Sequence, residues 1–128
     1  MHDHLAHGGD LTYRIIGLAM RVHRELGPGL LESVYHKCLC YELADAGIPF
    51  RSKVPLAVHY RDSMLEGGYF ADIIVADHVT LELKSVEHLL PVHESQLLTY
   101  LRLADVRIGL LINFNTVSLT DGIKRRVR

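Results

Sequence analysis

The chain has 128 residues, enough for one globular domain with one hydrophobic core. Apolar residues make up 48% and charged residues 23%, a composition that excludes a disordered or low-complexity protein. Lysine and arginine total 14 and aspartate and glutamate total 15, so the net charge is −1. That balance argues against a protein that holds nucleic acid mainly through a basic surface.

The chain carries no signal of a membrane or secretory protein. Its longest uninterrupted apolar runs are about four residues, too short to cross a bilayer, and no apolar stretch follows the N-terminus. Cys38 and Cys40 are two positions apart in an expected helix, so their side chains point away from each other and a disulfide is not expected. A reducing, cytoplasmic location is therefore the expectation.

Residues 1–9 are expected to form a flexible tail, and residues 10–128 a single domain. Three histidines in the tail could hold a metal weakly, although an unstructured end is favoured: His2, His4 and His7. Apolar residues at a spacing of three to four predict a first helix over about 11–26, with Asp10 as its N-cap. A second helix is predicted over about 31–46, where it stops at Gly47.

Alternating apolar residues then predict strands. One strand runs through Val54–Tyr60, and the segment Arg61–Gly68 is expected to be a turn. Two further strands are predicted at Tyr69–Val75 and Val79–Lys84, joined by the short turn 76–78. These three strands form an antiparallel meander.

The C-terminal third begins with Pro91, which precedes a helix predicted over about 92–104. The apolar run Val106–Phe114 predicts a strand buried on both faces, and Val117–Leu119 a short last strand. The basic cluster Lys124–Arg128 is interpreted as solvated surface rather than a nucleic-acid-binding arm. A helix between strands makes a parallel, right-handed connection, so the order α, α, β, β, β, α, β predicts a mixed sheet flanked by helices, in the α/β or α+β class.

Three charged residues lie inside the apolar hairpin 69–84. If Val75 pairs with Val79 across the turn, Asp72 faces Glu82 directly, and Lys84 projects from the same face as Glu82. Two carboxylates and a backbone carbonyl suit Mg²⁺ or Mn²⁺, and a neighbouring ammonium could orient an attacking water. A cross-strand ion network on a solvated face is the equally weighted alternative.

Two helical stripes add polar residues. Glu32, Tyr35 and His36 share one face of the second helix, and Gln96 and Tyr100 share one face of the third. Taken singly, each stripe is more typical of surface polarity or packing than of a site. Three further histidines could line a site, although a lone histidine is more typical of a structural contact than of a ligand: His23, His36 and His93.

Ordered motifs over about residues 11–128 resemble the GxxExxY protein family. Its signature corresponds to GLLESVY at 29–35, and further matching segments are VHRELGPG at 22–29, LELK at 81–84, LPVHESQLLTY at 90–100 and GLLINF at 109–114. The family resembles members of the PD-(D/E)XK nuclease superfamily, whose core order is αβββαβ. The resemblance therefore implies that core, with one extra helix at the N-terminus.

The resemblance also implies roles for individual residues. Asp72 and Glu82 correspond to the metal-binding acids, and the Leu83 carbonyl to a backbone ligand; Ala71 replaces the motif proline. Lys84 corresponds to the motif lysine, and Glu32 to an additional acid of the first core helix. Gln96 and Tyr100 resemble a motif that positions nucleic acid or the active site, and Tyr35, which belongs to the family signature, is grouped with them.

The leading functional prediction is a Mg²⁺- or Mn²⁺-dependent nuclease acting on DNA or RNA, which the chain alone holds weakly and for which a homodimer is expected. One alternative is a catalytically silent nuclease-fold module that binds a partner protein or nucleic acid. Another is a metal-dependent hydrolase of small phosphate esters, which the slightly acidic charge also fits. The sequence does not choose between DNA and RNA, or between endonuclease and exonuclease action.

Overall fold

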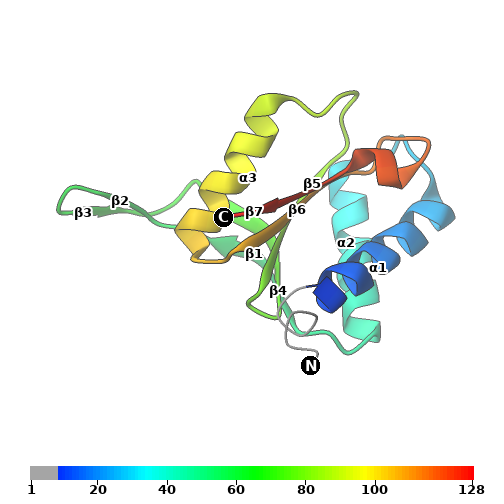
Figure 1. Cartoon of the computed structure of the whole chain (residues 1–128), viewed down its shortest axis with the longest axis horizontal. Coiled ribbons are helices and arrows are strands. Elements are labelled where there is room, and N and C mark those ends of the chain that lie inside the picture. Colours follow the sequence, from blue (N-terminus) through cyan, green and yellow to red (C-terminus); the bar gives the residue numbers. More distant parts are fainter. Residues whose placement is uncertain (1–8) are drawn as a thin grey trace.

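The computed structural model describes residues 9–128, so the predictions made for His2, His4 and His7 lie outside the described residues. In chain order the elements are α1 (Asp10–Leu26), α2 (Glu32–Asp45), β1 (Phe50–Pro55), β2 (Val58–Tyr60), β3 (Ser63–Leu65), β4 (Phe70–Val75), β5 (Val79–Lys84), α3 (Pro91–Ala104), β6 (Ile108–Asn113), the 3-10 helix η2 (Leu119–Gly122) and β7 (Ile123–Val127). Figure 1 shows their arrangement.

The main sheet has five strands in the order β1-β4-β5-β6-β7. Strands β5 and β6 are parallel and the other neighbours are antiparallel. Helix α3 connects the parallel pair, as predicted for a helix between two strands. The mixed sheet flanked by helices, and the αβββαβ order after an extra N-terminal helix, are therefore confirmed.

Helices cover both faces of the sheet, α1 and α2 one face and α3 the other (Figure 1). Successive residues of β5 point to opposite faces of the sheet, so Leu81 and Leu83 both lie in the core cluster under α1 and α2. On the other face, Leu111 of β6 clusters with Leu97 and Leu101 of α3. The even-numbered residues of β5, including Glu82 and Lys84, point away from the α1–α2 core.

The predicted strand through Val54–Tyr60 is two strands in the structure. β1 ends at Pro55, which has no N–H for a sheet hydrogen bond, and β2 begins at Val58. β2 pairs with β3, inside the segment predicted to be a turn, as a separate two-stranded sheet. Alternation detected extended backbone correctly, but it carries no information on which strand is the partner.

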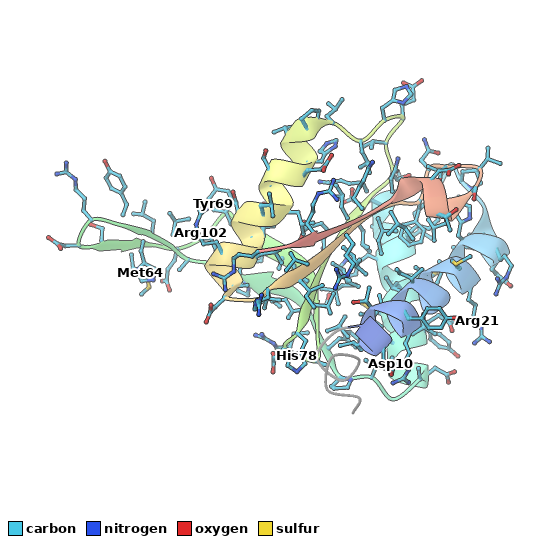
Figure 2. All side chains as sticks on the ribbon, in the orientation of Figure 1. Asp10, Arg21, Met64, Tyr69, His78 and Arg102 are labelled. Atoms are coloured by element: carbon cyan, nitrogen blue, oxygen red, sulfur yellow. The ribbon has the colours of Figure 1, made fainter. Side chains whose placement is uncertain are left out.

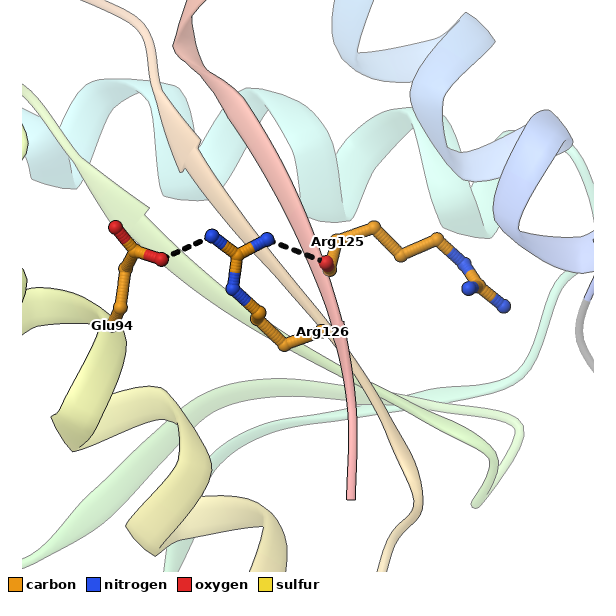
Figure 3. A network of polar contacts seen from close by, with 3 residues as sticks. All are labelled: Glu94, Arg125 and Arg126. Carbon is orange, nitrogen blue, oxygen red and sulfur yellow. Dashed lines mark hydrogen bonds and ion pairs between the residues drawn. The ribbon is translucent and has the colours of Figure 1, made fainter.

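The prediction of a last strand at Val117–Leu119 is wrong. That segment leads into η2, and the last strand is β7, made mostly of the basic cluster. β7 lies at the sheet edge, where charged residues are well tolerated. Figure 3 shows Arg126 reaching an ion pair with Glu94 of α3, while the side chain of Arg125 points to the opposite side of the strand. The basic cluster is thus part of the sheet.

Smaller predictions have mixed outcomes. Asp10 is the first residue of α1, not its cap; Gly9 occupies the N-cap position without a side-chain hydrogen bond. Asp10 instead places a negative charge in the first turn, where it interacts favourably with the positive end of the helix dipole. Cys38 and Cys40 are free thiols, as predicted. None of the helices in the described part of the chain has the length and apolarity needed to cross a membrane.

Candidate active site

The carboxylates of Asp72 and Glu82 meet between β4 and β5. The predicted register holds, because Val75 pairs with Val79 and the ladder continues in step toward the open end of the hairpin. At Asp72, hydrogen bonds to side chains take the place of the backbone hydrogen bonds between the two strands. The Asp72 N–H donates to Glu82 Oε2 at 3.1 Å, and Asp72 Oδ2 accepts from the Leu83 N–H at 2.8 Å. The Asp72 backbone therefore holds the Glu82 side chain, and the Leu83 backbone holds the Asp72 side chain.

Glu82 is a buried acid, only 4% exposed. Burial, and next the nearby charge of Asp72, raise the pKa of Glu82 to about 8. The hydrogen bond from Asp72 and the charge of Lys84 oppose that shift without cancelling it. A carboxyl group in this state gains strongly from a cation beside it.

Lys84 and Glu32 complete the charged cluster from two different elements. Glu32 begins α2, and burial raises its pKa while the charge of Lys84 lowers it. Neither residue forms an ion pair within the described residues. The ammonium of Lys84 thus lies within the electrostatic reach of Glu32 and Glu82 and is not committed to either one.

The glycine and the tyrosine of the GLLESVY signature both shape the turn before α2. Gly27 and Gly29 adopt φ of 69° and 98°, a region that disfavours residues with a Cβ. The Tyr35 hydroxyl donates to Gly27 O at 2.5 Å and accepts from Leu30 N at 3.2 Å. These bonds fix the turn from which Glu32 emerges.

Tyr35 does not face the site. Its side chain is fully buried and its ring stacks on Phe114, with centroids 4.5 Å apart. A direct contact between Tyr35 and nucleic acid is therefore excluded in this structure. What Tyr35 contacts instead is the turn before Glu32, through Gly27 and Leu30.

A second set of hydrogen bonds holds the chain that follows Lys84. Ser85 Oγ donates to Leu30 O at 2.6 Å, which links this loop to the α2 turn. Buried Asn113 accepts from the Val86 N–H at 3.0 Å and donates to Val86 O at 2.9 Å. The segment after the lysine is thus anchored both to the turn before α2 and to the end of β6.

Gln96 and Tyr100 of α3 lie together, as their spacing predicts. Gln96 Nε2 donates to the Tyr100 hydroxyl at 3.1 Å. Burial and the charge of Glu82 raise the pKa of Tyr100, which places this hydroxyl near the acidic pair. The ring of Tyr69 meets Tyr100 edge to face at 6.3 Å.

The histidines divide as their pattern suggests. His23 is buried and donates from Nε2 to Thr116 O at 2.8 Å, and His93 accepts from the Leu90 N–H at the start of α3. Both are structural contacts. His36 lies 2.7 Å from Ser52 Oγ; burial lowers its pKa, while the charge of Asp72 raises it. Among these three, His36 is the one beside the acidic cluster.

The donor set suits a hard divalent cation. Asp72 and Glu82 supply carboxylates, and the Leu83 carbonyl points to the same side of its strand as the N–H that binds Asp72. No group of three or more His, Cys, Asp and Glu side chains among the described residues is close enough to hold a metal. Glu32 therefore stands outside the immediate donor set, and two carboxylates with a carbonyl and water are what the site offers.

A mixed sheet between helical layers, with paired carboxylates and a lysine on its central hairpin, defines a nuclease-like domain. A family model of the PD-(D/E)XK nuclease superfamily matches residues 9–126, and the chain belongs to this superfamily. No curated protein and no solved structure matches the chain. Members of the superfamily generally hydrolyse phosphodiester bonds and typically use divalent metals.

Sequence reasoning missed several residues around the site. Lys53, with φ of 51°, interrupts the β1–β4 pairing at the position opposite Asp72. The ring of Tyr69 meets that of Tyr100. Ser85 and Asn113 anchor the loop after Lys84. Their positions in the sequence signal nothing, because each acts through a contact between distant elements.

Proposed function

We propose that the protein is a Mg²⁺- or Mn²⁺-dependent nuclease that hydrolyses phosphodiester bonds of DNA or RNA. The observation that carries this proposal is the pairing of Asp72 with buried Glu82, in which the Asp72 N–H holds Glu82 and the Leu83 N–H holds Asp72, in a superfamily of phosphodiester-hydrolysing proteins. A solvated ion network is the weaker interpretation, because Glu82 is buried and lacks an ion-pair partner among the described residues.

The residues that would hold the cation are Asp72, Glu82 and the Leu83 carbonyl, with Glu32 as an outer acid. A bound cation would supply positive charge to stabilise the charge that develops on the phosphate. Asp72 keeps Glu82 in place through the bond from its N–H to Oε2. Glu32, at the start of α2, extends the negative field toward Lys84.

Lys84 is the proposed catalytic cation. Since it forms no ion pair in the described part of the chain, its ammonium group can donate hydrogen bonds to the attacking water and to the phosphate. Gln96 and Tyr100 hold polar groups on the α3 side of the same cluster, where they would position the nucleic acid.

We also propose membership of the GxxExxY family within the superfamily. Support comes from the signature itself, since its glycine needs a positive φ and its tyrosine fixes the turn before its glutamate. A homodimer and a cytoplasmic location remain predictions from the sequence. Weak binding of nucleic acid by the single chain is expected from the net charge of −1.

A cleavage screen at low salt tests the proposal. Labelled single-stranded and double-stranded DNA, RNA and branched substrates are incubated with Mg²⁺ or Mn²⁺ and with wild type, Glu82→Gln or Lys84→Met. Lys37→Met and Glu25→Gln, at exposed positions of α2 and α1, are the matched controls. Metal-dependent cleavage is expected for wild type and both controls, and a loss of at least about 100-fold for the two site variants.

The alternatives predict other results. Cleavage retained by folded Lys84→Met would contradict the role of that lysine. If the folded protein binds no metal and cleaves no substrate, it would instead be the catalytically silent module. Metal binding with hydrolysis of small phosphate esters only would identify the third candidate. Titration calorimetry with Mn²⁺ on wild type and Asp72→Ala separates these outcomes.

A further inference from the structure

The β2–β3 hairpin projects as an arm away from the helices and the main sheet (Figure 1). It is a two-stranded sheet separate from the main one, and every residue of 61–70 is exposed. A two-stranded hairpin without cover is at best marginally stable in water.

Aromatic side chains mark the arm from its tip to its base. Tyr60 is 63% exposed near the tip, and Tyr69 and Phe70 are 48% and 47% exposed where the arm rejoins β4. The guanidinium of Arg61 lies over the Tyr60 ring, 5.9 Å from its centroid. Figure 2 shows Tyr69 at the base of the arm.

The base of the arm is continuous with the candidate active site. The Tyr69 ring meets Tyr100 edge to face, and the Tyr69 carbonyl accepts a 2.9 Å hydrogen bond from the Leu56 N–H. Leu56 is buried in the same cluster as Tyr100. A strand of nucleic acid lying on the arm would therefore lead directly to the Gln96–Tyr100 pair.

The chemistry of the arm favours bases over phosphates. Between positions 56 and 70 the charged residues are Arg61, Asp62 and Glu66, so the arm has no positive excess to attract a phosphate backbone. Aromatic rings and a guanidinium plane stack on exposed base faces. In a duplex those faces are hidden in the base stack, whereas in a single strand they are free.

We propose that the β2–β3 hairpin, through Tyr60, Arg61 and Tyr69, binds unpaired bases by stacking and directs a single strand into the active site. This inference rests on the proposed nuclease function and specifies its substrate as nucleic acid with unpaired nucleotides. A second copy of the chain or a partner protein on the same arm is the competing occupant.

The test measures binding with Lys84→Met, which would prevent cleavage during the assay. Fluorescence anisotropy gives the affinity for a labelled single strand of DNA or RNA and for the matching duplex. The proteins compared are Lys84→Met alone and Lys84→Met combined with Tyr60→Ala, Tyr60→Phe or Tyr41→Ala. Tyr41 is equally exposed, but it lies on α2 away from the arm. The fold of each variant is checked by circular dichroism, and Tyr60→Ala is expected to fold because its ring is exposed.

The expected results follow from stacking. The single strand binds more tightly than the duplex, and Tyr60→Ala weakens single-strand binding at least about fivefold. Tyr60→Phe restores binding and Tyr41→Ala leaves it unchanged. Because stacking releases no counterions, the Tyr60→Ala effect is the same at low and at high salt.

Equal affinity for strand and duplex, or equal effects of Tyr60→Ala and Tyr41→Ala, would overturn the inference. A dimer that dissociates in Tyr60→Ala without loss of single-strand affinity would overturn it in favour of a second copy. Parallel cleavage by wild-type protein separates the two proposals. If the protein cleaves nucleic acid but Tyr60→Ala has no effect, only the proposal for the arm is contradicted. If binding depends on Tyr60 but no cleavage occurs, only the proposed nuclease activity is contradicted.

Discussion

The Ser85 hydroxyl donates a 2.6 Å hydrogen bond to the carbonyl oxygen of Leu30. Ser85 directly follows the lysine at the end of β5, and Leu30 lies two residues before the glutamate that begins α2. The N–H of the same Leu30 donates to the Tyr35 hydroxyl. One residue of the turn before α2 therefore couples the buried Tyr35 to the strand that carries Lys84.

Tyr35→Phe is expected to lower the free energy of unfolding by about 1–3 kcal/mol, because Gly27 O and Leu30 N lose their hydrogen bonds to a hydroxyl on a fully buried side chain. Ser85→Ala is expected to cost about 1 kcal/mol. Both bonds meet at Leu30, so the double variant should deviate from additivity by about 0.5 kcal/mol or more.

Urea unfolding measures all three variants. Tyr41→Phe is the matched control for the tyrosine, since its ring is exposed and its removal of a hydroxyl should change stability by less than about 0.5 kcal/mol. Additive effects of the two substitutions would show that Leu30 does not couple the two elements.

Much of the fold was predictable from local patterns. The turn at 76–78 set the β4–β5 register, which then brought Asp72 against Glu82. The basic residues of β7 hid a strand, because an edge strand tolerates charge and lacks the apolar alternation that marks a half-buried one. The break at Pro55 was equally hidden, since extended backbone on both sides of it has one continuous alternation.

The site was predictable only where spacing alone brings residues together. Gln96 and Tyr100 are one helical turn apart, so their hydrogen bond follows from the sequence. The contact between Ser85 and Leu30 joins residues 55 positions apart, and the burial of Tyr35 depends on Phe114 from beyond β6. Such contacts depend on tertiary packing, which no short window of sequence contains.

Metal binding is expected to release a proton. With a pKa of about 8, Glu82 is mostly protonated below that pH in the metal-free protein, whereas a ligand must be a carboxylate. Near pH 6.5, binding of Mn²⁺ should release about one proton, and above pH 8 the release should fade. The affinity should rise with pH and level off above about 8 for the same reason.

Titration calorimetry in buffers of different ionisation enthalpy measures this proton release. Glu82→Gln is the control, because it keeps the shape of the side chain without an ionisable proton. Binding by wild type at pH 6.5 with no proton release would contradict ligation by Glu82.

Without metal, Glu82 should make stability fall as pH rises. Its pKa is raised in the folded state, so its contribution is fully present below the unfolded value near 4.5 and is lost as pH rises through about 8. Glu82→Gln should therefore match wild type near pH 5 and exceed it near pH 9, by on the order of a few kcal/mol. Urea unfolding in a chelating buffer measures the difference, and a parallel pH dependence of the two proteins would contradict burial of an ionisable Glu82.

Two glycines offer a matched pair of opposite sign. At Gly122 an added Cβ would lie 2.3 Å from the Asn113 carbonyl oxygen, so backbone must move, whereas at Gly17 in α1 no atom lies within 4 Å. Gly122→Ala should cost about 1–3 kcal/mol, and Gly17→Ala should add roughly 0.5–1 kcal/mol of stability. Because Asn113 also holds Val86, Gly122→Ala should additionally weaken Mn²⁺ binding, which Gly17→Ala should not.

Urea unfolding and Mn²⁺ titration of both glycine variants separate stability from the site. If Gly122→Ala is destabilised yet binds Mn²⁺ like wild type, the Asn113–Val86 anchor does not position the loop that follows Lys84. The opposite outcome is that Gly122→Ala changes both stability and Mn²⁺ binding, whereas Gly17→Ala changes stability alone. The end of β6 would then support the candidate site, because its residue Asn113 holds Val86 in the segment that follows Lys84.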